Sequence, residues 1–258
     1  MTPPRLLIVT PTLDTGGAER QVTHLAIGLA ELGHPVSICC VDEIAADTAE
    51  LARAGVPVVE LGGRSPSTRA RALPRLTALA RRADVVIASN WDATFWGRVA
   101  AAVARRPAIA IEHAVYREQQ ISRRGKPRAR LIAWHNRVLD PLTYATVACA
   151  DAQRAVLLAE GVDGRKIVRI PNGVPLGALR EAAARGATRA ALGIPADARV
   201  LVHVARLTRL KNQRQTLATA RALRARLGAD VHVLLVGPGE DQAALERETA
   251  DEPWAHVL

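Results

Sequence analysis

Short apolar runs alternate with segments of helical spacing along most of the chain, and this alternation restricts the folds open to it. Between residues 5 and 170 the runs lie at 5–10, 35–41, 56–61, 84–89, 107–112, 145–149 and 166–170. Their apolar residues are consecutive rather than at every second position, which predicts strands that are buried on both faces. The predicted fold class is therefore α/β, a doubly wound parallel sheet covered by helices.

The segments between these runs have the spacing of helices. Over residues 18–33 the apolar side chains step by three or four, which predicts a helix with one buried face, and Gly33 is placed to end it. This strand-to-helix order is the pattern of repeated βα units.

The alternation of strands and helices is interrupted at residues 171–197, which are rich in Gly, Pro and Ala, and resumes after them. The later elements are predicted as a strand at 198–207, a helix at 212–228, a strand at 230–237, a helix at 240–248 and the first residues of another strand. We therefore expect an N-terminal Rossmann-like domain at 1–172, a linker at 173–197 with a hinge at 171–177, and the start of a second Rossmann-like domain at 198–258. Two strands and part of a third cannot bury both faces of a sheet, so the second domain is expected to be incomplete.

The composition is that of a globular protein, with 258 residues of which 49% are hydrophobic and 23% charged. No apolar run reaches the roughly 18 residues of a membrane span, and the first residues lack a secretory signal, so a cytoplasmic location is expected. Cys39, Cys40 and Cys149 have neither metal-ligand spacing nor a disulfide framework. Cys39 and Cys40 lie in an apolar run and are predicted to be buried thiols.

The net charge is +10, and its densest basic stretch is 117–137, with seven basic residues against one acidic residue. Arg123, Arg124, Lys126 and Arg128 belong to it. Such a stretch favours anionic lipid or phosphate, so we hypothesise contact with an anionic membrane at its inner face or with a phosphorylated acceptor. A solvated basic loop explains the same residues. Nucleic-acid binding would rest on charge alone and is set aside.

Two glycines, Gly16 and Gly17, stand between the first strand and the first helix. Glycines there let a ligand approach the main chain, and the helix start offers free N–H groups to an anion, although a plain turn would need no ligand. The stretch is neither G-x-G-x-x-G nor a P-loop. That argues against a nicotinamide-dependent oxidoreductase, for which Asp42 after the second strand would hold the ribose.

Three further stretches follow strand ends, where α/β sheets bind ligands. Arg206 and Lys211 flank a short loop before a helix and could clamp a diphosphate, or they form a solvated basic loop. His113 could contact a substrate, or it is a structural histidine. Gly237 and Gly239 form another strand-to-helix turn, followed by acidic residues that favour a helix start.

In combination, TGGAERQ, EHA, KIVRIPNGV, VARLTRLKNQRQTL and LLVGPGED, spread over residues 5–248, resemble the retaining glycosyltransferases of family four. The resemblance implies the two-domain GT-B fold, no metal or other cofactor, and transfer of a hexose from a nucleotide diphosphate sugar to a glycan or lipid-linked acceptor, as in polysaccharide biosynthesis. Members of that family continue into strands and a Glu-rich segment beyond this point. A fragment, or a non-catalytic glycan- or partner-binding remnant, is therefore the alternative expectation.

The resemblance also implies roles for particular residues. Arg206 and Lys211 would hold the donor diphosphate and stabilise the leaving group, and His113 would contact the transferred sugar. The remaining residues are implied to bind donor or acceptor: Gly16, Gly17, Glu19, Arg20, Asn172, Gly237 and Gly239. Helix-start electrostatics explains Glu19 equally well.

Overall fold

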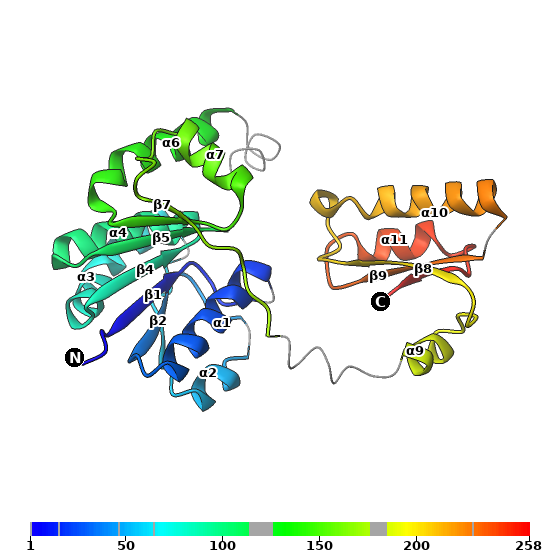
Figure 1. The fold of residues 1–258 in the computed structure, drawn as a ribbon, viewed down its shortest axis with the longest axis horizontal. Helices are drawn as coiled ribbons and strands as arrows, with labels where there is room; N and C mark the ends of the chain where they lie inside the picture. The colour runs from blue at the N-terminus through cyan, green and yellow to red at the C-terminus, as the bar shows by residue number, and fades with distance from the viewer. Residues whose placement is uncertain are drawn as a thin grey trace. The chain divides into compact units, whose positions relative to one another are not determined.

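The computed structural model describes residues 2–14, 16–45, 47–63, 65–113, 126–175, 185–228 and 230–258. It divides into two compact units, Met1–Pro175 and Leu176–Leu258. Each unit is a parallel sheet with helices packed on it (Figure 1).

The first unit is built on a seven-stranded sheet. Its strands are β1 Leu6–Thr10, β2 Val36–Cys40, β3 Val58–Glu60, β4 Val85–Ser89, β5 Ala108–Glu112, β6 Ala145–Ala148 and β7 Ile167–Arg169. Its helices are α1 Gly17–Glu31, α2 Ala49–Arg53, α3 Pro66–Arg82, α4 Trp91–Ala104, α6 Lys126–Leu139, the short 3-10 helix η1 Asp140–Leu142 and α7 Asp151–Ala159. Each predicted strand of this unit is confirmed, although β3 and β7 are shorter than the apolar runs that predicted them.

The strand order is β3-β2-β1-β4-β5-β6-β7, and every pair of neighbours is parallel. The chain therefore moves outward in one direction from β1 and in the other from β4. Ligands of open α/β sheets bind at the carboxyl ends of the strands near such a reversal. The loop after β1 and the ends of β4 and β5 lie at this edge.

Both faces of the sheet are buried, as the consecutive apolar runs predict. Leu6 and Ile8 pack in one core with Val22 of α1, whereas Leu7 and Val9 pack in the other core with residues of α3 and α4. Cys39 and Cys40 lie on opposite faces and are both fully buried, which confirms that prediction. Burial raises the pKa of each of these two thiols to about 12, so neither is reactive at neutral pH.

Local sequence fixes where the helices begin and end. After α1, Gly33 adopts a φ of +86°, and the N–H groups of Gly33 and His34 donate to the carbonyls of Ala30 and Leu29. This is a Schellman ending, which requires a left-handed residue where Gly33 stands. Helix α4 lies close to the sheet because Gly97 faces β4, where an added Cβ would be 2.8 Å from the Cβ of Ala88.

The second unit has a three-stranded sheet in the order β10-β9-β8. Its elements are α9 Arg185–Ala191, β8 Arg199–Val204, the 3-10 helix η2 Arg209–Lys211, α10 Gln213–Leu227, β9 Val231–Val236, α11 Gln242–Glu248 and β10 Ala255–Val257. The predicted third strand is present as β10. Helix α9 differs from the sequence expectation, because it lies inside the stretch assigned to a linker.

Candidate functional site

The two glycines that follow β1, Gly16 and Gly17, differ in their surroundings. Gly16 caps α1 in an extended conformation, and a Cβ on it would lie 2.1 Å from Oε2 of Glu19. The carboxylate of Glu19 therefore fills the space beside Gly16, and Oγ1 of Thr12 donates to its Oε1 at 3.5 Å. An added Cβ on Gly17, in contrast, meets nothing within 4 Å, and Gly17 is exposed. The open approach to the main chain is at Gly17.

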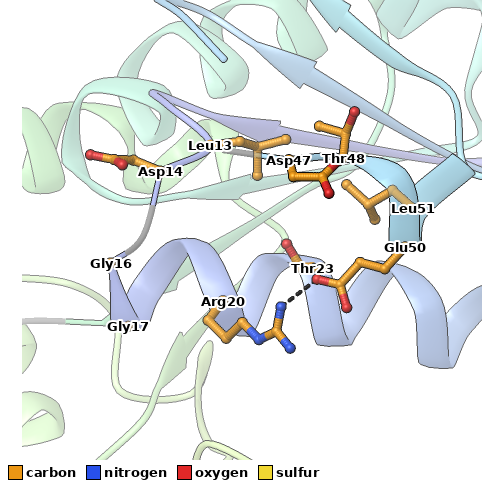
Figure 2. Close-up of a pocket in the computed structure, with 10 residues that line it drawn as sticks. All are labelled: Leu13, Asp14, Gly16, Gly17, Arg20, Thr23, Asp47, Thr48, Glu50 and Leu51. Atoms are coloured by element: carbon orange, nitrogen blue, oxygen red, sulfur yellow. Dashed lines mark hydrogen bonds and ion pairs between the residues drawn. The ribbon is translucent and has the colours of Figure 1, made fainter. Parts of the chain in front are cut away.

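Arg20, one turn into α1, pairs with Glu50 on α2. Both side chains line a cavity of about 420 Å³ between α1 and the segment that leads into α2 (Figure 2). Gly16 and Gly17 line the same cavity. The structure therefore brings Gly16, Gly17 and Arg20 together at one site, with Glu19 packed beside it.

His113, directly after β5, is held by residues from the neighbouring strand ends. Its Nε2 lies 3.1 Å from Oγ of Ser89 at the end of β4, and its Nδ1 lies 3.6 Å from Sγ of Cys149 after β6. The side chain of Asn172 also hydrogen-bonds to the ring. Burial lowers the pKa of His113 below its usual value, and the Asn172 hydrogen bond opposes this only in part. The imidazole is therefore neutral at pH 7.

The segment after β7 joins this histidine to the glycine loop. β7 is the last strand at one edge of the sheet, and the chain then crosses toward α1 (Figure 1). Asn172 contacts His113, and the carbonyl of Gly173 accepts a 2.8 Å hydrogen bond from Nε2 of Gln21 on α1. His113, Asn172 and α1 thus form one connected edge of the first unit.

A buried polar network lies beneath His113. Glu112 at the end of β5 is 6% exposed, and burial raises its pKa to about 7, with the attraction of Arg98 acting against the rise. Arg98 is 3% exposed, and its Nη2 donates to Oδ1 of Asn136 at 3.1 Å. Asn136 in turn donates to Oε2 of Glu160 at 2.7 Å. Arg98 therefore attracts Glu112 through its charge and reaches Glu160 only through Asn136. The network places a titrating group, Glu112, next to the histidine.

Asp42, the residue that a ribose-binding role would need, is engaged elsewhere. Its Oδ1 accepts a 2.7 Å hydrogen bond from Nε of Arg69, whose Nη2 reaches the other carboxylate oxygen. The side chains of both residues are only 14% exposed. This pair leaves the Asp42 carboxylate occupied and removes the support for a nicotinamide site.

In the second unit, Arg206 and Lys211 stand on either side of the turn between β8 and α10, and both are exposed. Lys211 ends η2, and only Asn212 separates it from α10. The carbonyl of Arg206 accepts from Nε2 of the buried Gln213 at 2.9 Å. Within the described ranges, neither cationic side chain has an ion-pair or hydrogen-bond partner. Two uncompensated cations therefore stand at the amino end of a 15-residue helix.

Gly237 and Gly239 bring a second loop against this turn. A Cβ on Gly237 would lie 2.5 Å from the carbonyl oxygen of Ala205, and one on Gly239 would lie 2.1 Å from that of Leu207. The N–H of Leu207 donates to the carbonyl of Pro238 at 2.8 Å. The close approach that these glycines allow is thus between two backbone segments, which fixes the loop that carries Arg206.

The predicted basic stretch lies partly outside the described residues, because residues 114–125, which include Arg117, Arg123 and Arg124, are not described. Its remainder forms α6, on which Trp134 and Arg137 are exposed. The described part of the chain contains neither a helix long and apolar enough to cross a bilayer nor a group of three metal-ligating side chains.

Sequence reasoning missed Ser89, Cys149 and the network around Glu112. Ser89 and Cys149 each end an apolar run, so the sequence predicts their position at the edge of the sheet. It does not predict their contact with His113, because that contact depends on β4, β5 and β6 being neighbours.

A family model described as Glycosyltransferase Family 4 matches residues 15–177, which is more than half of the chain. The chain belongs to glycosyltransferase family 4. The matched region contains the glycine loop, His113 and the crossing segment at Asn172.

Relatives of this family 4 chain include one curated protein, D-inositol 3-phosphate glycosyltransferase of Kineococcus radiotolerans. It is 47% identical over 66 residues, which is 25% of this chain and 15% of that protein. Among solved structures, Anabaena Alr3699/HepE in complex with UDP has a TM-score of 0.76 at 20% identity, covering 98% of this chain and 68% of that one. A glycosyltransferase from Rickettsia africae has a TM-score of 0.74 at 16% identity, with 99% and 68% covered. These likenesses establish the GT-B fold.

Proposed function

We propose that the chain takes part in transferring a hexose from a nucleotide diphosphate sugar to a hydroxyl of a glycan or lipid-linked acceptor. The bond from the anomeric carbon to the diphosphate oxygen breaks, and its electron pair stays on the diphosphate. The acceptor oxygen bonds to the anomeric carbon and gives up its proton to the departing diphosphate, directly or through water. Retention of configuration and independence of metal follow from the family resemblance, and activity in the presence of EDTA tests the latter.

The observation that carries the proposal is the pair of exposed, uncompensated cations at the start of α10. Charge develops on the diphosphate as the sugar leaves, and preorganised cations lower the barrier for that step. Arg206 and Lys211 are assigned this role, since Gln213 and the Gly237–Gly239 turn hold their loop in place. Solved relatives in complex with UDP and UDP-glucose support the donor class.

The role assigned to His113 is to hydrogen-bond the sugar that is transferred. A neutral imidazole can donate or accept such a bond without placing a charge beside the reacting carbon. Burial keeps the ring neutral at pH 7. Both ring nitrogens have a protein partner, Ser89 at Nε2 and Cys149 at Nδ1, so in this proposal a sugar hydroxyl replaces one of these partners. In this proposal the first unit positions the sugar and the acceptor, and the second unit binds the diphosphate.

Thermal unfolding in the presence of nucleotide sugars tests the donor assignment. We expect UDP-glucose or another nucleotide diphosphate hexose to raise the Tm, and Arg206→Ala and Lys211→Ala each to abolish most of that rise. Arg226→Ala is the matched control, because Arg226 is exposed at the far end of α10. A rise that survives both site substitutions would contradict the assignment. A rise without any sugar transfer would favour the binding remnant over the enzyme.

We also propose that α6 meets an anionic membrane surface. Trp134 is 56% exposed, Val138, one turn further along, is 47% exposed, and Arg137 between them is exposed. Aromatic and basic side chains on one helix favour the interface of an anionic bilayer. Trp134→Ala should lower binding to vesicles rich in phosphatidylglycerol, as should the combined alanine variant of Arg123, Arg124, Lys126 and Arg128. The control is Leu32→Ala, which removes an apolar side chain that is 76% exposed directly after α1. Unchanged binding in both variants would refute the membrane contact.

A further inference from the structure

Ser89 presents a buried hydroxyl group to the ring of His113. Ser89 is 0% exposed, and its Oγ lies 3.1 Å from Nε2 of His113. Among the residues that the structure describes, this hydroxyl has no second hydrogen-bond partner. Buried donors are almost always hydrogen-bonded, so the O–H of Ser89 must donate to Nε2. Nε2 is therefore an acceptor and has no proton of its own.

The backbone fixes Ser89 beside the ring. Ser89 lies opposite Ile111 in the register of β4 and β5, and the N–H of Asn90 donates to the carbonyl of Ile111 at 3.2 Å. Asn90 adopts a φ of +69°, which residues other than glycine rarely adopt. Such a conformation persists only where the surrounding structure enforces it. The end of β4 that carries Ser89 is therefore held firmly against the end of β5.

The contact at the other ring nitrogen is weaker. The neutral ring carries its one proton on Nδ1, because Nε2 is the acceptor, and Sγ of Cys149 lies 3.6 Å from Nδ1. Burial raises the pKa of the Cys149 thiol, and the charge of Glu112 adds to the rise. The sulfur is therefore a protonated thiol at neutral pH. A thiol is a weak acceptor for the N–H of the ring.

The weaker partner is also the more accessible one. Cys149 is half-buried, and Asn172, which also bonds to the ring, is exposed. The Asn172 hydrogen bond raises the pKa of His113, which is the effect of an oxygen that accepts from the ring. A ligand oxygen at Nε2 would deprive the buried Ser89 hydroxyl of its partner, which is costly. A ligand oxygen at Nδ1 displaces only a thiol.

We infer that Ser89 is a positioning residue that fixes the proton of His113 on Nδ1, and that this N–H donates to an oxygen of the transferred sugar in place of the Cys149 thiol. The inference rests on the proposed function, from which it takes the contact between His113 and the sugar. It adds which ring nitrogen makes that contact, in which direction the hydrogen bond runs, and which buried side chain determines both.

Nitrogen-15 NMR of the full chain without nucleotide, at about pH 8, locates the proton, because protonated and unprotonated ring nitrogens have well-separated chemical shifts. The resonances of His113 are those that disappear in His113→Ala. We expect Nδ1 to be the protonated nitrogen in the unmodified chain. Ser89→Ala removes the donor to Nε2 and should move a measurable share of the proton to Nε2. Cys149→Ala is the matched control at the other nitrogen and should leave the proton on Nδ1.

The affinities for UDP and UDP-glucose test the sugar contact. Ser89→Ala should weaken UDP-glucose about three- to tenfold, the value of one hydrogen bond, and leave UDP unchanged. Cys149→Ala should keep or raise the affinity for UDP-glucose, because it removes the partner that the sugar displaces.

The inference is overturned if the unmodified ring has its proton on Nε2, if Ser89→Ala leaves both ring resonances unchanged, or if Cys149→Ala weakens UDP-glucose as much as Ser89→Ala does. A chain that has the proton on Nδ1 but binds neither nucleotide would contradict the proposed function and the sugar contact with it, whereas the role of Ser89 at the ring would stand.

Discussion

Replacing Glu112 by Gln should stabilise the first unit by an amount that depends on pH. Glu112 is 6% exposed, and burial raises its pKa from the ordinary 4.5 to about 7. Between these two values the folded chain keeps a proton that the unfolded chain has lost. Because folding is linked to proton binding, the contribution of Glu112 to the free energy of unfolding must fall as the pH rises from about 4.5 to about 7.

The size of the effect follows from the two pKa values. Each pKa unit corresponds to about 1.4 kcal/mol, so the ionisable Glu112 costs the folded state about 2 kcal/mol at pH 6 and about 3 kcal/mol above pH 7. Gln resembles the protonated carboxyl group, since it is neutral and can still accept from Oγ1 of Thr94. Glu112→Gln should therefore match the unmodified chain near pH 4.5 and exceed its stability by about 3 kcal/mol at pH 8.

Urea unfolding followed by tryptophan fluorescence measures this difference. Three of the four tryptophans lie in the first unit, so a Trp254→Phe background restricts the signal to it. Glu31→Gln is the control, because it makes the same substitution at an exposed position at the end of α1. Parallel stability curves for Glu112→Gln and the unmodified chain between pH 4.5 and 7 would refute the reasoning.

Two further predictions concern the loops of the site. Gly239→Ala should destabilise the second unit by about 2 kcal/mol or more, because its Cβ would meet the backbone oxygen of Leu207. Gly17→Ala should be nearly neutral, because its Cβ would meet nothing within 4 Å. Equal losses of Tm in the two variants would contradict this interpretation of the turn. Asn172→Asp should raise the pKa of His113, because it places a carboxylate against the ring. An unchanged histidine titration by NMR would show that the two side chains are not in contact in solution.

Periodicity predicted what depends on local sequence. The strands of the first unit, the ending of α1 at Gly33 and the burial of Cys39 and Cys40 all follow from spacing and from backbone preference. Helix α9 was missed because its segment, rich in Ala and Arg, has no apolar face to give a periodic signal.

The interior of the site depends on contacts that no local pattern encodes. Ser89 and Cys149 contact His113 only because β4 and β6 flank β5. The periodicity of apolar residues does not predict the order of strands in a sheet. The resemblance implies that Gly239 binds donor or acceptor, and this stays a prediction. The structure adds that Gly239 approaches the carbonyl of Leu207, more than thirty residues earlier in the chain, which no local pattern indicates.

In the proposed function Arg206 binds the diphosphate of the donor and His113 hydrogen-bonds its sugar. Calorimetric titration of UDP and UDP-glucose into the unmodified chain, Arg206→Ala and His113→Ala tests these two assignments most directly. The account predicts that Arg206→Ala weakens both ligands, because both carry the diphosphate, and that His113→Ala weakens UDP-glucose while the affinity for UDP stays the same. A ratio of the two affinities that is unchanged in His113→Ala, or UDP binding that is intact in Arg206→Ala, would contradict it.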